Sequence, residues 1–120
     1  MPVFLKPLTQ PDDAETVELN KLADEQDDPV WRDAWRDWCA GDAAMRLWAG
    51  WFNDHIVGAI LTRDRCIEGL AVRRVTRGRG VATRMMTLLL EQGDWTVHPE
   101  IAEASRSFIR RRFPCPPRDG

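Results

Sequence analysis

Several residue types are scarce in this 120-residue sequence, and each shortage narrows what the protein can be. It has no tyrosine and only two histidines. Cys39, Cys66 and Cys115 are odd in number and far apart, which favours reduced structural thiols over a disulfide framework or a zinc site. No apolar run approaches the roughly 18 residues of a membrane span, and the N-terminus lacks the long apolar centre of a signal peptide. We therefore expect a cytoplasmic protein with no metal centre and no membrane partner.

The net charge is also small, since 17 basic and 19 acidic residues give −2. Nucleic-acid-binding proteins usually carry positive potential over a whole face, so this balance argues against a nucleic-acid partner. The length predicts a single domain spanning residues 1–120, because a second core would not fit.

One stretch, residues 68–92, combines an apolar strand ending near Val72, a basic loop over 73–80 and a helix over 81–92. A helix start leaves about four backbone N–H groups without internal partners, and the peptide dipoles add roughly half a positive charge there. Gly78 and Gly80 leave those amides uncovered and can adopt positive φ. Five nearby cations are Arg73, Arg74, Arg77, Arg79 and Arg84. The pattern predicts a site for a polyanion such as a pyrophosphate, with a solvated basic face as the alternative.

Turn residues and apolar periodicity predict the remaining elements. They are an edge strand over 3–8, a helix from 11 to about 25, a helix over 29–40, a hairpin of strands 45–52 and 55–63, a strand over 66–72, a strand over 94–98 and a helix from 99 to 112. The last helix is expected to begin at Pro99 and to bury Ile101, Ala104 and Phe108. Three prolines predict an irregular tail over 113–120.

These elements follow the order β-α-α-β-β-β-α-β-α, which predicts an α/β (mixed α+β) fold with a mixed central sheet and helices on both faces. In the second helix, Trp31, Trp35 and Trp38 share one face. Core packing and a contact surface are both open for that face, because tryptophan is enriched at interface hot spots.

The segment from Arg77 to Ala82 matches [QR]-x-x-G-x-[GA], the motif that marks the Gcn5-related N-acetyltransferase (GNAT) superfamily between a strand and a helix. The element order over residues 3–112 resembles that superfamily too. The resemblance implies that acetyl-CoA (or CoA) places its pyrophosphate on the loop amides and its pantetheine along the preceding strand. The positions implied are Leu70, Ala71, Val72, Arg77, Gly78, Arg79, Gly80, Val81, Ala82 and Thr83.

A narrower resemblance is carried by residues 72–81, VRRVTRGRGV, which are similar to the V-R-x-V-T-R-x-R-G-V run of the PanZ (PanM) family. The segment Phe52-Asn53 is similar too, and the close match covers residues 45–92. This resemblance implies an acetyl-CoA-binding regulator that contacts the aspartate 1-decarboxylase proenzyme, promotes its autocleavage and controls pantothenate and CoA synthesis.

Two other functions are compatible with the sequence, an N-acetyltransferase acting on a small-molecule or peptide amine, and a general anion- or nucleic-acid-binding module. Acetyl transfer needs a base and a proton donor. Glu68 is the candidate base, although pairing with a nearby arginine is an equally good role for it. The superfamily's usual donor is a tyrosine, which this chain lacks, so Ser105 or Cys115 would have to serve.

The superfamily usually adds a pair of strands after the last helix. The prolines of the tail, Pro114, Pro116 and Pro117, cannot donate ladder hydrogen bonds. We therefore expect this pair to be missing or reduced to one short edge segment.

Overall fold

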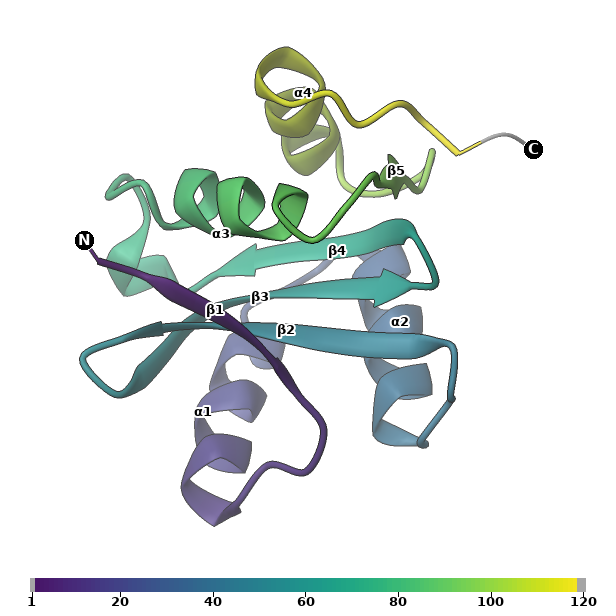
Figure 1. Cartoon of the computed structure of the whole chain (residues 1–120). Helices are drawn as coiled ribbons and strands as arrows, with labels where there is room; N and C mark the ends of the chain where they lie inside the picture. The colour runs from purple at the N-terminus through teal and green to yellow at the C-terminus, as the bar shows by residue number, and fades with distance from the viewer. Residues whose placement is uncertain (1, 119–120) are drawn as a thin grey trace.

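The computed structural model describes residues 2–118, which form one mixed sheet and four α-helices (Figure 1). The elements are β1 (Phe4–Leu8), α1 (Asp13–Asp24), α2 (Pro29–Cys39), β2 (Met45–Phe52), β3 (His55–Arg63), β4 (Cys66–Val72), the 3₁₀ turn η1 (Arg74–Thr76), α3 (Val81–Leu90), β5 (Thr96–Val97) and α4 (Glu103–Arg112). The predicted element order is confirmed. Within this part of the chain, no helix has the length and apolarity needed to cross a membrane.

The sheet has the strand order β1-β2-β3-β4-β5, with β1 at one edge as expected. The first four strands pair antiparallel, and β5 joins β4 in parallel. Asn53 and Asp54 form the predicted tight turn between β2 and β3, with φ angles of 49° and 65°. Their short polar side chains tolerate this left-handed backbone better than most residues do.

Helices cover both faces of the sheet, as predicted: α1 and α2 lie on one face, and α3 and α4 on the other (Figure 1). Each face has its own apolar core. Trp31 belongs to the α1–α2 core and is only 2% exposed, so core packing is confirmed for this residue. Trp35 and Trp38 are half-buried against the same core. The Trp35 ring stacks on Trp31, and the Trp38 ring is tilted against Trp35.

Three strand glycines let helices approach the sheet unusually closely. A Cβ built on Gly50 or Gly58 would lie 2.5 Å or 2.7 Å from atoms of the Met85 side chain on α3. On the other face, a Cβ on Gly69 would lie 2.4 Å from the Trp31 ring of α2. Since real Cβ atoms do not approach so closely, these glycines fix how deeply α2 and α3 sit on the sheet.

The C-terminal third departs from the predictions at two places. The strand expected over 94–98 shrinks to Thr96–Val97, and the last helix begins at Glu103 instead of Pro99. The cause is a turn at residues 98–101, in which Glu100 N–H donates to Nδ1 of His98 (3.0 Å). Ile101 is buried as predicted, but it precedes the helix. Ala104 is exposed, and Ile109 fills the core position on α4 instead.

Residues 113–118 of the tail carry no helix or strand, but hydrogen bonds hold them beside β5. Val97 N–H donates to the Pro116 carbonyl (2.9 Å), and Arg118 N–H donates to the Val97 carbonyl (2.8 Å). Prolines lack the N–H donor but keep the carbonyl acceptor, so a one-residue parallel bridge between Val97 and Pro117 forms beside β5. The C-terminal strand pair of the superfamily is thus reduced to this one-residue bridge, which agrees with the expectation of a short edge segment. Cys115 is buried in the α3–α4 core, and residues 119–120 of the tail predicted to be irregular lie outside the described residues.

Candidate functional site

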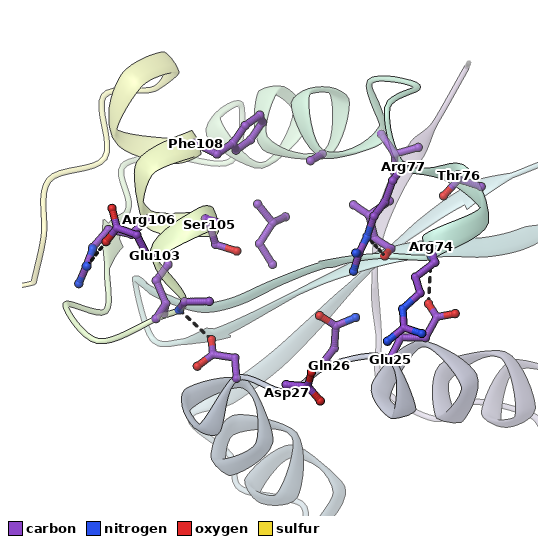
Figure 2. Close-up of a pocket in the computed structure, with 18 of the residues that line it drawn as sticks. Glu25, Gln26, Asp27, Arg74, Thr76, Arg77, Glu103, Ser105, Arg106 and Phe108 are labelled. Carbon is purple, nitrogen blue, oxygen red and sulfur yellow. Dashed lines mark hydrogen bonds and ion pairs between the residues drawn. The ribbon is translucent and has the colours of Figure 1, made fainter.

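The cavity of interest opens where β4 loses its second neighbour. β5 pairs only with Cys66 and Ile67, and the last backbone hydrogen bond between the two segments runs from His98 N–H to the Ile67 carbonyl (2.9 Å). Further along β4, Nε of Arg77 donates to the Val72 carbonyl (3.4 Å). Glu68 falls at a register shift between β3 and β4, and from Gly69 to Val72 β4 is paired with β3 alone. Leu70 and Val72 on this free edge line a cavity of about 1140 Å³ (Figure 2). The edge therefore offers backbone donors and acceptors to an extended ligand.

The start of α3 forms one end of the cavity. Its N-cap is Gly80, which has a φ of 79° and supplies no side-chain cap. Gly78 has the same φ, and a Cβ built on either glycine would meet nothing within 4 Å. The first-turn amides of α3 are thus open to the cavity side and carry the positive end of the helix dipole. This geometry suits a phosphate or pyrophosphate.

The basic loop is tied to the α1–α2 connection by Glu25. Its Oε1 accepts from Nε of Arg73 (3.1 Å) and from the backbone N–H of Arg74 (3.1 Å). Burial would raise the pKa of Glu25, but the hydrogen bond from Arg74 and the pairing with Arg73 outweigh it and leave that pKa below its ordinary value. Arg73 is therefore occupied by a carboxylate, whereas Arg74 and Arg77 remain exposed along the cavity (Figure 2).

Most of the site residues predicted from the sequence come together at this cavity. Those that line it are Leu70, Val72, Arg77, Gly78, Gly80, Val81, Ala82 and Thr83. Ala71 points into the opposite core and is 2% exposed, so only its backbone lies near the cavity. Arg79 is exposed but does not line the cavity.

Apart from Ser105, which was named as a candidate proton donor, the residues of the other walls were not predicted as site residues. These walls come from the α1–α2 connection, residues 25–28, with Pro29, and from α4, where Ser105 and Phe108 line the cavity (Figure 2). No local motif marks these segments, because they reach the site only through the tertiary fold. The spacing of apolar residues could at most have placed them at helix ends.

Glu68, the candidate base, lies away from the cavity and is 6% exposed. Its carboxylate pairs with Nε of Arg63 (3.3 Å) and Nη1 of Arg118 (3.6 Å). Arg63 also contacts Asp37 (2.6 Å) and Asp42 (2.9 Å), so Glu68 belongs to a charged network at the far end of β4. This placement favours the arginine-pairing role that the sequence left open for it.

Of the two candidate proton donors, Ser105 lines the cavity and Cys115 does not. Burial raises the pKa of the Cys115 thiol, which keeps it protonated at neutral pH within the core.

A strand that splays from its neighbour beside a glycine loop and a helix start, within this strand order, defines the GNAT class of acetyltransferase folds. The chain belongs to the PanZ family of acetyltransferase (GNAT) domains, whose model matches residues 2–113.

Solved structures share the fold at low sequence identity. YhhK from E. coli, in a solution NMR structure bound to coenzyme A, has a TM-score of 0.69 and 20% identity over 92% of this chain and 89% of that one. A ribosomal-protein-alanine N-acetyltransferase from Brucella melitensis has a TM-score of 0.66 and 15% identity, covering 98% and 95% of the two chains. A GNAT acetyltransferase from Elizabethkingia anophelis with acetyl-CoA bound has a TM-score of 0.58 and 12% identity, covering 92% and 73%. No curated protein matches the sequence significantly.

Proposed function

We propose that the protein binds acetyl-CoA, or CoA, in the cavity between β4 and α4. The observation that carries this proposal is the free edge of β4, which runs directly into the uncapped start of α3. The amides of Gly78 to Thr83 would hold the pyrophosphate, with Arg74 and Arg77 beside it. The backbone of Leu70 to Val72 would pair with the amides of pantetheine. Membership of the PanZ family and the coenzyme A bound by YhhK support this assignment.

The second part of the proposal is regulation by contact. Bound acetyl-CoA would order the basic loop, and a surface built partly from that loop would meet the aspartate 1-decarboxylase proenzyme and promote its autocleavage. The family assignment supports this role. It also agrees with the lack of tyrosine and with the engagement of Glu68 by two arginines. Acetyl-CoA would thereby control pantothenate and CoA synthesis in the cytoplasm.

Calorimetry and a cleavage assay test the two parts separately. Titration with acetyl-CoA, with CoA and with a nonspecific oligonucleotide should show binding of the coenzymes alone. Binding of the oligonucleotide without the coenzymes would replace the proposal with a general anion-binding module. Mixing the protein with the decarboxylase proenzyme should accelerate cleavage only when acetyl-CoA is present. Unchanged cleavage and no complex would refute the regulatory role while leaving the coenzyme site intact.

An N-acetyltransferase is the second candidate, favoured by one observation: Ser105 on α4 lines the same cavity (Figure 2). A serine hydroxyl is a poor acid, so such an enzyme would rely on substrate orientation and solvent. Thiol release from acetyl-CoA over a panel of amines is the measurement that separates this function from regulation. We expect no release above the rate without protein.

A further inference from the structure

One carboxylate bridges the cavity at the end opposite the basic loop. Oδ2 of Asp28 accepts a hydrogen bond from the backbone N–H of Ala102 (2.9 Å), 74 residues away in the chain. Both residues line the cavity, Asp28 from the wall before α2 and Ala102 from the wall before α4. The hydrogen bond therefore joins two walls of the cavity that lies beside the free edge of β4.

Asp28 is the residue type that this position needs. Its Oδ1 accepts from Val30 N–H (3.1 Å) and caps α2, while its Oδ2 makes the bridge. Both partners are donors, and they lie on two different segments, so the side chain uses two separate acceptor oxygens. A carboxylate has two such oxygens, whereas an amide or a hydroxyl of this reach has one. The N–H of Ala102, the N-cap of α4, is thereby satisfied although that cap has no side-chain hydrogen bond.

The two joined segments differ in how firmly they are held. α2 is fixed on β4 one turn after Asp28, where the Trp31 ring presses on Gly69. Within residues 2–118, the α4 side chains that contact the core are Phe108 and Ile109, which lie beyond the first turn of the helix. The Asp28 bridge thus fastens the start of α4 to a helix that is seated directly on β4.

The position of the bridge gives it a function, in an argument that rests on the proposed coenzyme binding. A pyrophosphate at the start of α3 and a pantetheine arm along the free edge of β4 would place the thioester near Leu70, at the end of the cavity away from the loop. We infer that the Asp28–Ala102 bridge closes the acyl end of the coenzyme slot, so that it limits the acyl group to a short one. Asp28 is thereby a specificity-determining residue that tells acetyl-CoA from longer acyl-CoAs.

The test measures the ratio of dissociation constants for butyryl-CoA and acetyl-CoA, within each variant, by calorimetry. The wild-type protein should prefer acetyl-CoA by about tenfold or more, because two added methylenes meet a closed wall. Asp28→Ser keeps a good N-cap for α2 but cannot reach Ala102, and Ala102→Pro removes the donor while leaving Asp28 intact. Both should reduce the preference to within about threefold.

Asp12→Ser is the matched control, because Asp12 caps α1 through Glu15 N–H and does not line the cavity. It should keep the wild-type ratio. The inference is overturned if the wild-type protein binds both thioesters equally, if both bridge variants keep the preference, or if the Asp12 variant loses it. Failure of the wild-type protein to bind acetyl-CoA at all would instead refute the proposed coenzyme site.

Discussion

The two halves of β4 show how one strand serves two purposes. Its first residues, Cys66 and Ile67, are paired on both sides, and Glu68 is locked between two arginines. Its last residues, Leu70 to Val72, are paired with β3 alone, and Leu70 and Val72 line the cavity. One end of the strand thus serves the fold and the other is the proposed binding edge, with the change occurring within three residues.

The two halves of β4 differ because of the elements that follow it in the chain, and not because of the strand itself. β5 ends after two residues because a turn at His98 and Pro99 carries the chain away from the sheet. The ladder that would have covered Leu70 to Val72 is therefore never built. An interrupted strand pairing, next to an uncapped helix start, is enough to create a candidate site.

The largest effect on coenzyme binding is expected from Gly80→Glu, at the start of α3 beside the cavity. A carboxylate beside the proposed pyrophosphate should weaken CoA binding more than about a hundredfold, because like charges at close range cost several kcal/mol. Gly41→Glu is the control, since Gly41 also has positive φ (85°) with nothing within 4 Å, and lies outside the cavity. Both variants carry the same backbone strain. Equal CoA affinities for the two in calorimetry would contradict the site.

A second pair of variants separates two loop arginines. Arg77 lines the cavity and Arg79 does not, so Arg77→Met should weaken CoA binding about tenfold, and Arg79→Met less than about twofold. Affinities measured at two salt concentrations check the cause, because the Arg77 variant should also show the weaker salt dependence. Equal losses would mean that the loop acts as a diffuse basic face.

Beside the doubly paired end of β4, Glu68→Gln should lower the stability of the fold without changing the affinity for CoA. It weakens the pairing with Arg63 and Arg118, while Asp37 and Asp42 still neutralise Arg63. We expect the free energy of unfolding to fall by about 1–2 kcal/mol in a denaturant titration, with CoA affinity unchanged. Glu91→Gln, at an exposed site, should stay within about 0.5 kcal/mol of the wild type. A loss of CoA affinity in the Glu68 variant would remove the distinction between the two halves of β4.

The smallest effect concerns the pH dependence of the loop tether. The pKa of Glu25 is lower in the folded protein than its ordinary value of 4.5, so its stabilisation is fully present above pH 4.5 and is lost as pH falls through the folded pKa. Glu25→Gln should lower the free energy of unfolding by about 1 kcal/mol at neutral pH. Thermal unfolding of the two proteins should converge in acid. A constant difference at all pH values would show that Glu25 acts through packing instead.

The sequence was informative where function depends on local geometry. The spacing of Gly78 and Gly80 before an apolar helix predicted an open helix start, and apolar runs separated by short polar turns predicted β2, β3 and β4. It was uninformative where contacts join distant segments. Nothing near Asp28 indicates that its second oxygen reaches Ala102.

The late start of α4 has the same origin. Pro99 is a good first residue for a helix, but a hydrogen bond to the His98 ring makes a turn instead, and α4 begins at Glu103. In the tail, the prolines cannot donate ladder hydrogen bonds, but the Pro116 carbonyl accepts from Val97 N–H. Where a helix begins and whether a tail segment is held in place depend on the hydrogen-bond partners that the tertiary fold brings near. The neighbouring residues in the sequence do not identify those partners.

The seat of Met85 on Gly50 and Gly58 has a consequence for how this protein can vary. Neither glycine lines the cavity, yet a larger residue at Gly50 would press on Sδ and Cγ of Met85 and so push α3, with the amides of its first turn, away from the sheet. The space beneath the Met85 thioether thus helps to set the height of the proposed phosphate site above the sheet. A substitution in the loop could be compensated by another substitution in the loop, whereas a larger residue beneath Met85 would require α3 to move.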